Sequence, residues 1–199
     1  MLTKLKQQVQ ALLTTEARTA HKLHLTPNRI SALGIILAIL AALAYTQWQQ
    51  NTLYLLAAVI LLLASGFCDV LDGAVARQYQ QSTPFGGFLD SLLDRYADAI
   101  IYIAIILGTL CEVLWGLIAI VGSLLVSYSR ARAEAAGTKM ESIGLAERPE
   151  RLIILSVATI IAYLWQPQTT MNWTIILLAV LSNLTVIQRA YYAYRKLKK

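Results

Sequence analysis

The chain has 199 residues, of which 57% are hydrophobic, and its mean hydropathy is +0.57. This composition is too apolar for a soluble domain of the same length and leaves no room for a separate soluble domain. The formal net charge of +6 would suit a nucleic-acid partner. No basic and aromatic recognition module accompanies that charge, so we expect no nucleic acid to bind. We predict an all-α integral membrane protein in which residues 1–199 form a single domain.

The first 24 residues are too charged and polar for a membrane span or a cleavable signal peptide. Within residues 2–22, apolar side chains recur at roughly helical spacing, with lysines and glutamines elsewhere. This pattern predicts an interfacial amphipathic helix that lies on the inner membrane surface, in contact with membrane lipids. Its apolar positions are Leu2, Leu5, Val9, Leu12, Leu13 and Ala17.

Six apolar runs follow, and each is long enough to cross a hydrocarbon core of about 30 Å as a helix. We therefore predict a bundle of six transmembrane helices within residues 28–190. Ser82 or Thr83 is suited to cap the third helix, with Pro84 in its first turn. The predicted spans are 28–48, 53–76, 86–110, 113–133, 149–165 and 171–190.

The 17 lysines and arginines all lie at the termini, in the second and fourth connectors, or in the helix segments beside them. The first, third and fifth connectors contain none. Cationic loops stay on the cytoplasmic side of a membrane. We therefore expect a multi-pass protein of the plasma membrane whose termini, and any site at the same helix ends, face the cytoplasm.

Two neighbouring helices carry aspartates at these inner ends. Asp69 and Asp72 are three residues apart, whereas Asp90, Asp94 and Asp98 follow one another at intervals of four, so each set shares a helix face. The short connection between the two helices makes them antiparallel neighbours. The sequence therefore predicts that Asp69, Asp72, Asp90 and Asp94 face one another at matching depth.

Four facing carboxylates would repel one another strongly in a site of low dielectric constant, and bound cations would relieve that repulsion. A ligand set of oxygen atoms alone favours two Mg²⁺ or Mn²⁺ ions, which suit phosphoryl chemistry. Two other interpretations stay open: a path for protons or sodium ions, or carboxylates paired with Arg77 and Arg95. Gly73 and Gly86 would let a ligand approach the backbone, or would serve helix packing.

The spacing D-x2-D-G-x2-A-R-x8-G-x3-D-x3-D over residues 69–94 resembles the signature of the CDP-alcohol phosphatidyltransferases. The resemblance implies a six-helix membrane fold, commonly dimeric, in which an alcohol hydroxyl attacks the β-phosphate of a CDP-lipid and CMP leaves. The donor would be CDP-diacylglycerol or CDP-archaeol. By this resemblance Asp94 is the general base as well as a metal ligand, with Asp69, Asp72 and Asp90 as the other ligands. The residues implied for the CDP-lipid are Asp69, Gly73, Ala76, Arg77 and Gly86.

A second resemblance concerns Ser127-Tyr-Ser-Arg-Ala-Arg-Ala-Glu134 and the segment Glu147-Arg-Pro-Glu-Arg151. Both are similar to the branch of that family that uses inositol phosphate. The resemblance implies that Arg130, Arg148 and Arg189 bind the acceptor's phosphate, a task for which the guanidinium fork is suited.

Other roles remain open for these arginines. Each one could instead be an inner-leaflet anchor, and glycerol 3-phosphate is the alternative acceptor. A carboxylate-lined ion transporter is the alternative from a different class of protein. We also expect Glu147 and Glu150 to hold Arg148 and Arg151 in place.

Overall fold

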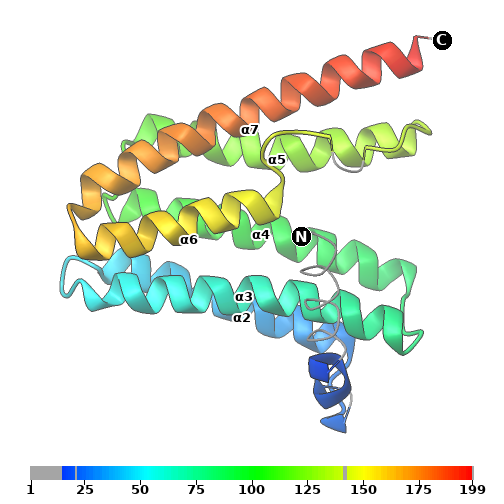
Figure 1. Ribbon diagram of the computed structural model, residues 1–199, viewed down its shortest axis with the longest axis horizontal. Helices are drawn as coiled ribbons and strands as arrows, with labels where there is room; N and C mark the ends of the chain where they lie inside the picture. The colour runs from blue at the N-terminus through cyan, green and yellow to red at the C-terminus, as the bar shows by residue number, and fades with distance from the viewer. Residues whose placement is uncertain (1–14, 21, 141–142, 199) are drawn as a thin grey trace, which may run out of the picture.

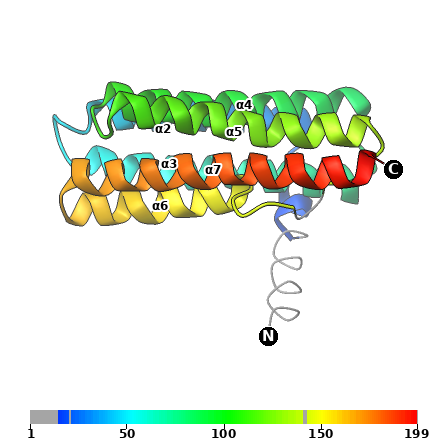
Figure 2. The ribbon, with the colours of Figure 1, turned by 90° about the horizontal axis from the view of Figure 1, so that it is seen from above.

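The computed structural model describes residues 15–20, 22–140 and 143–198. Every regular secondary-structure element within these residues is a helix, which confirms the predicted all-α class. The helices lie side by side with nearly parallel axes (Figures 1 and 2). Their bounds are α2 Pro27–Gln47, α3 Leu53–Gln78, α4 Pro84–Leu107, α5 Val113–Ala135, α6 Arg148–Leu164 and α7 Pro167–Leu197.

One end of this bundle gathers the cationic segments. The starts of α2, α4 and α6 and the ends of α3, α5 and α7 all point toward the same end, as Figure 1 shows. The lysines and arginines of the described residues lie in these helix ends or in the segments that adjoin them, which we call the polar end. The alternation therefore brings together, at one level, the residues that the charge pattern predicted to share a membrane side.

The segment before α2 packs beside the polar end. Residues 15–20 are helical. Ala17 and Ala20 are buried in a small apolar cluster with Ile30, Cys68 and Val75 of the neighbouring helices. The rest of the predicted amphipathic helix, residues 2–14, lies outside the described residues. The small side chains of Ala17 and Ala20 let residues 15–20 approach α2 and α3 closely.

Four helices are long and apolar enough to cross a membrane by length and composition: α2, α3, α5 and α7. The other two fall short for reasons that bear on the site. α4 carries Asp90, Asp94, Arg95 and Asp98 within its first 15 residues, out of 24. α6 has 17 residues and begins at Arg148. Length and composition therefore give four candidate spans rather than the six predicted.

Helix boundaries agree closely with the predicted spans except at α7. Thr83 caps α4 as expected, and its hydroxyl accepts a hydrogen bond of 2.9 Å from the Gly86 amide. α7 was expected over 171–190 but begins at Pro167 and runs to Leu197. The prediction followed apolarity alone, whereas proline fits the first helical turn and the basic, tyrosine-rich segment after residue 190 continues the helix.

Close packing of α2 against α3 sets the position of the site. Ser65 Oγ donates a 2.8 Å hydrogen bond to the carbonyl oxygen of Gly34. A Cβ added to Gly34 would lie 3.2 Å from Cys68 Cβ, so the backbones here approach as only small residues allow. This contact brings Ser31, one turn earlier on α2, against Asp72 of α3.

Candidate active site

Three of the four predicted aspartates meet between α3 and α4. Asp69, Asp72 and Asp90 each place one carboxylate oxygen so that all three oxygens lie within 4.8 Å of one another. Asp72 is only 4% exposed, and the other two are half-buried. The antiparallel helix pair therefore brings carboxylate oxygens of these three residues together, as their spacing predicted.

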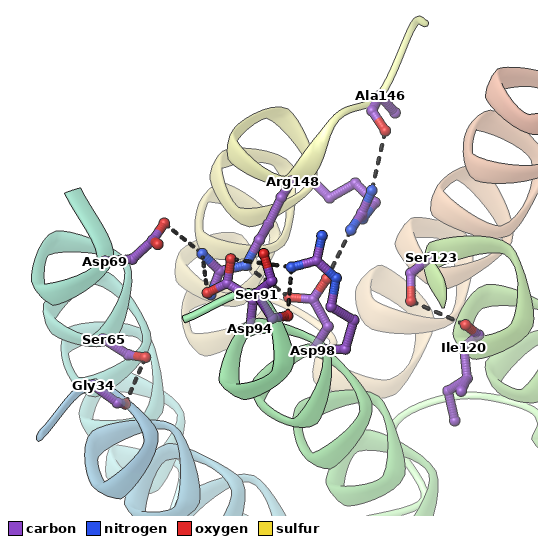
Figure 3. A network of polar contacts seen from close by, with 12 residues as sticks. Gly34, Ser65, Asp69, Ser91, Asp94, Asp98, Ile120, Ser123, Ala146 and Arg148 are labelled. Atoms are coloured by element: carbon purple, nitrogen blue, oxygen red, sulfur yellow. Dashed lines mark hydrogen bonds and ion pairs between the residues drawn. The ribbon is translucent and has the colours of Figure 1, made fainter. Parts of the chain in front are cut away.

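Asp94 joins this group through an arginine. Arg148 Nη1 lies 2.5 Å from Asp69 Oδ2 and 3.0 Å from Asp94 Oδ1 (Figure 3). Arg95 contributes a longer ion pair of 3.6 Å to Asp94. Arg148 therefore lies between helices α3 and α4 and partly neutralises the acidic group. The alternative of structural pairing named Arg77 and Arg95 for this task, and of these two Arg95 pairs with Asp94.

The donor set fits small divalent cations. Carboxylate oxygens are the ligands that Mg²⁺ and Mn²⁺ prefer, and no histidine or cysteine lies in the group of three. A cavity of about 20 Å³ between the carboxylates is lined by Ser31, Asp69, Asp72, Asp90, Asp94 and Arg148, among others. It has room for an ion or an ordered water but not for a larger ligand. The residues present are thus suited to a divalent-ion centre.

Ser31 is a site residue that the sequence did not single out. Its hydroxyl donates a short hydrogen bond to Asp72 Oδ2 and lies 3.1 Å from the carbonyl oxygen of Pro27. Its position one turn into α2, after Thr26-Pro27-Asn28, was visible in the sequence. Nothing in the sequence connects that position to an aspartate 41 residues away, so this contact depends on the α2–α3 packing.

A second cavity adjoins the carboxylates on the side of the α3–α4 connector. It has a volume of about 170 Å³ and is lined by Asp72, Gly73, Ala76, Arg77, Gly86 and Asp90, together with residues of the connector and of the start of α2. A Cβ at Gly73 would lie 3.1 Å from Arg77 Nη1, and one at Gly86 would lie 3.0 Å from Thr83 Oγ1. Both glycines thus keep this cavity open. Asp69, also predicted to contact the donor, lines the carboxylate cavity instead.

The three predicted acceptor-binding arginines have separate partners. Arg148 binds the aspartates, whereas the half-buried Arg130 pairs with Glu134 at 2.9 Å, one turn along α5. Arg189 is 2% exposed. Its guanidinium donates to the carbonyl oxygens of Val126 and Ile143 at 2.5 and 2.7 Å and to Glu147 at 2.7 Å. The structure therefore brings Arg148 to the site and gives the other two contacts of their own.

The expected partners of the α6 arginines are wrong. Glu147 pairs with Arg189 rather than Arg148. The carboxylate partner of Arg151 is Asp98, at 2.7 Å, and not Glu150. The reason is spatial. The side chains of Arg148 and Arg151 reach Asp98 of α4, whereas Glu147, the residue before α6, reaches Arg189 of α7.

Relatives of known name match this chain over most of its length. The archaetidylinositol phosphate synthase of Methanothermobacter thermautotrophicus is 44% identical over 179 residues, 90% of this chain and 88% of that protein. The enzyme of the same name from Pyrococcus horikoshii is 40% identical over 198 residues, 100% of this chain and 99% of that protein.

A solved structure has the same fold. The crystal structure of Mycobacterium tuberculosis phosphatidylinositol phosphate synthase with CDP-DAG bound matches with a TM-score of 0.78 and 30% sequence identity. The match covers 92% of this chain and 94% of that chain. The same enzyme in complex with manganese and citrate matches with a TM-score of 0.79, again at 30% identity, over 92% of this chain and 88% of that one.

The family expected from the aspartate spacing is also matched directly. The model of the family described as CDP-alcohol phosphatidyltransferase matches residues 24–190, which span α2 to α6 and most of α7. With the motif residues gathered at one site and relatives at 40% identity or more, this chain is a membrane transferase that belongs to the CDP-alcohol phosphatidyltransferase family.

Proposed function

We propose that this enzyme transfers the phosphatidyl or archaetidyl group of CDP-diacylglycerol or CDP-archaeol to a hydroxyl of myo-inositol phosphate and releases CMP. The observation that carries the proposal is the meeting of Asp69, Asp72 and Asp90 beside the cavity lined by Gly73 and Gly86. The names of the two relatives at 44% and 40% identity support inositol phosphate as the acceptor.

Asp69, Asp72, Asp90 and Asp94 would hold two Mg²⁺ or Mn²⁺ ions. When bound, the ions supply positive charge to the diphosphate and to the departing CMP. The chain's own residues would do the rest. The cavity beside Gly73, Ala76, Arg77 and Gly86 would receive the cytidine diphosphate end of the donor, with Arg77 as its cation.

Asp94 is our candidate for the general base. Its carboxylate lies 3.0 Å from Arg148, the arginine that we propose for the acceptor's phosphate. An acceptor held by Arg148 would therefore have its hydroxyls within reach of Asp94 Oδ, which would take the proton as the new phosphate ester forms. Arg130 and Arg189 would add positive charge to the acceptor side, Arg130 after leaving Glu134.

We propose six transmembrane helices, with both termini and the site facing the cytoplasm from the plasma membrane. α4 packs against α2 and α5, and α6 packs against α3 and α7, so both lie within the bundle of candidate spans. The charged residues of α4 lie between Asp90 and Asp98, and its aspartates face the other residues of the site. Residues 1–199 would act as one domain, in a homodimer as the resemblance implies.

The assay for this function is CMP release by the purified protein. We expect release to need three additions together: a CDP-lipid, myo-inositol phosphate and Mg²⁺ or Mn²⁺. Parallel reactions would compare CDP-archaeol with CDP-diacylglycerol, and inositol phosphate with glycerol 3-phosphate. The mass of the lipid product identifies the acceptor and the tail in one measurement.

Three results would contradict the proposal at different points. Turnover with glycerol 3-phosphate but not with inositol phosphate would show that the proposed acceptor is wrong. Undiminished turnover after EDTA treatment, or with Asp90→Asn, would show that the reaction does not need the metal centre. A lost ligand should reduce the rate by more than about 100-fold. Glu112→Gln, an exposed carboxylate at the opposite end of the bundle, is the matched control and should keep full activity. Ion flux without any CMP release would favour the transporter class.

A further inference from the structure

Asp98 is a fifth carboxylate that lies outside the family signature. It follows Asp94 by one turn of α4, and the motif over residues 69–94 does not include it. It also lies outside the group of three carboxylates whose oxygens meet within 4.8 Å. Its role therefore has to be inferred from its own contacts.

Both oxygens of Asp98 bind arginines from the start of α6. Asp98 Oδ1 accepts from Arg148 Nε at 3.3 Å, and Asp98 Oδ2 accepts from Arg151 Nη2 at 2.7 Å (Figure 3). The two arginines are three residues apart and so share one face of α6. Asp98 thus ties that face to α4, next to the aspartates of the site.

Arg151 fixes Asp98 in turn. It is 3% exposed, and its Nη1 donates a 3.1 Å hydrogen bond to the carbonyl oxygen of Ala146. A buried guanidinium with a backbone carbonyl on one side and a carboxylate on the other has little freedom to turn. The oxygen that Asp98 presents to Arg148 is therefore held in a defined place.

Two of the three guanidinium nitrogens of Arg148 have partners in the structure. Its Nε binds Asp98, and its Nη1 is shared by Asp69 and Asp94. Within residues 15–20, 22–140 and 143–198, its Nη2 has no hydrogen-bond or ion-pair partner. A planar guanidinium held at Nε presents its remaining donors in a fixed direction, which is the form of recognition that a phosphate group favours.

The three carboxylates that bind Arg148 differ in whether they also have a proposed role as metal ligands. Asp69 and Asp94 are the residues that we propose as metal ligands, so their oxygens have a second task. Asp98 is the one carboxylate partner of Arg148, in the part of the chain that the structure describes, without that task. It is therefore the partner that would keep Arg148 in place throughout the reaction.

We propose that Asp98 is a positioning residue for the acceptor: it holds Arg148 at Nε and so directs the free donors of Arg148 toward the phosphate of a phosphorylated alcohol. This inference rests on the proposed function. Asp98 touches neither substrate and acts through Arg148, with Arg151 as its support. Its loss should therefore weaken the binding of the acceptor and spare the donor.

The test is steady-state CMP release by Asp98→Asn, with each substrate varied in turn. We expect the apparent KM for inositol phosphate to rise about tenfold, the effect of one lost charge-assisted hydrogen bond. The KM for the CDP-lipid and kcat should stay within about twofold of the wild type. Calorimetric titration with inositol phosphate should show the same loss of affinity, and Glu112→Gln should match the wild type in both measurements.

A double-mutant comparison separates positioning from a general loss of stability. In an Arg148→Lys background, which has no Nε fork, adding Asp98→Asn should change the acceptor KM by less than about twofold. If Asp98→Asn does not fold, Asp98→Glu keeps the charge that Arg151 needs and displaces it by one methylene. That variant should still raise the acceptor KM several-fold while the donor KM holds.

The outcomes distinguish this inference from the function on which it rests. Equal losses for both substrates, an unchanged acceptor KM, or additive effects in the double mutant would overturn the role of Asp98 while leaving the transferase intact. If the wild-type enzyme uses only glycerol 3-phosphate, the proposed acceptor is wrong. The same KM comparison would then be made with glycerol 3-phosphate. A wild type that releases no CMP with any phosphorylated alcohol would overturn both.

Discussion

Asp72 shows how a single contact prepares a carboxylate for metal binding. It is the most buried of the four motif aspartates, and Ser31 of α2 donates a hydrogen bond to its Oδ2. A carboxylate with one oxygen held by a hydroxyl keeps its other oxygen oriented for an ion. The serine thus places α2 in the site, although this helix contributes no charged residue to it.

Ser31→Ala should weaken metal binding at Asp72 without unfolding the protein. We expect the Mg²⁺ or Mn²⁺ concentration for half-maximal CMP release to rise by about 10- to 100-fold, as when a metal ligand loses its supporting hydrogen bond. Ser123→Ala is the control, because Ser123 is also buried but donates to Ile120 O of its own helix, away from the aspartates. An unchanged metal requirement in Ser31→Ala would show that Asp72 needs no hydroxyl partner.

What the sequence predicted at this scale followed from spacing along one helix pair. Asp69, Asp72 and Asp90 could be placed together because three and four are helical intervals and the α3–α4 connector is short. The contacts of Ser31 and Arg148 could not be found in this way. They join residues 41 and 79 positions apart, and such contacts depend on how α2 and α6 pack against the pair, which no local pattern encodes.

At the scale of elements, an arginine from α7 holds residues 143 and 147, which precede α6. Arg189 donates to carbonyl oxygens of Val126 on α5 and Ile143 in the connector, and to Glu147 next to α6. Three segments are thereby tied to one buried side chain. Because Arg148 follows Glu147 directly, the placement of α6's first residue depends on this tie.

Arg189→Ala should therefore destabilise the protein even without substrate. The loss removes the Arg189 donor from the Ile143 carbonyl and from Val126 O, which keeps the Ser129 hydroxyl as a donor, and leaves Glu147 without its cation. We expect the apparent melting temperature to fall by about 5 to 10 °C. Arg132→Ala is the matched control, since Arg132 is exposed and has no ion pair among the described residues. If Arg189 served only the acceptor's phosphate, melting without acceptor would be the same in wild type and variant, and only the acceptor KM would change.

The helix boundaries show what apolarity alone predicts well and where it misleads. It placed α2, α3 and α5 within two residues at each end, because uncharged connectors or turn residues interrupt the apolar runs there. It shortened α7, whose final turns carry Tyr191, Arg195 and Lys196 and remain helical. Arg195 lies over the Tyr191 ring at 5.9 Å, a cation–π contact between residues one turn apart that suits a helix in the membrane interface.

At the scale of the whole molecule, the starts of α2, α4 and α6 and the ends of α3, α5 and α7 lie at one end of the bundle (Figure 1). These helix segments carry the cations and the aspartates of the site. This arrangement separates the charged chemistry from the opposite end of the bundle, whose connectors contain no lysine or arginine. It also explains why α4 and α6 fall short as spans by composition, because both contribute charged residues to the polar end. Intramembrane charges are tolerated where they face partners in the bundle interior, so the same residues that lower the apolarity also satisfy one another.

Single cysteines in or next to the connectors test whether α4 and α6 cross the membrane. In a variant with Cys68 and Cys111 replaced by alanine, cysteines would be placed at four exposed positions, one on each side of α4 and of α6: Gln78, Glu112, Lys139 and Gln168. A membrane-impermeant maleimide added to intact cells should label Glu112→Cys and Gln168→Cys and spare Gln78→Cys and Lys139→Cys until the membrane is opened. Because consecutive connectors must change sides for every span, equal labelling of Gln78→Cys and Glu112→Cys would mean that α4 does not cross, and the inverse pattern would place the active site outside the cell.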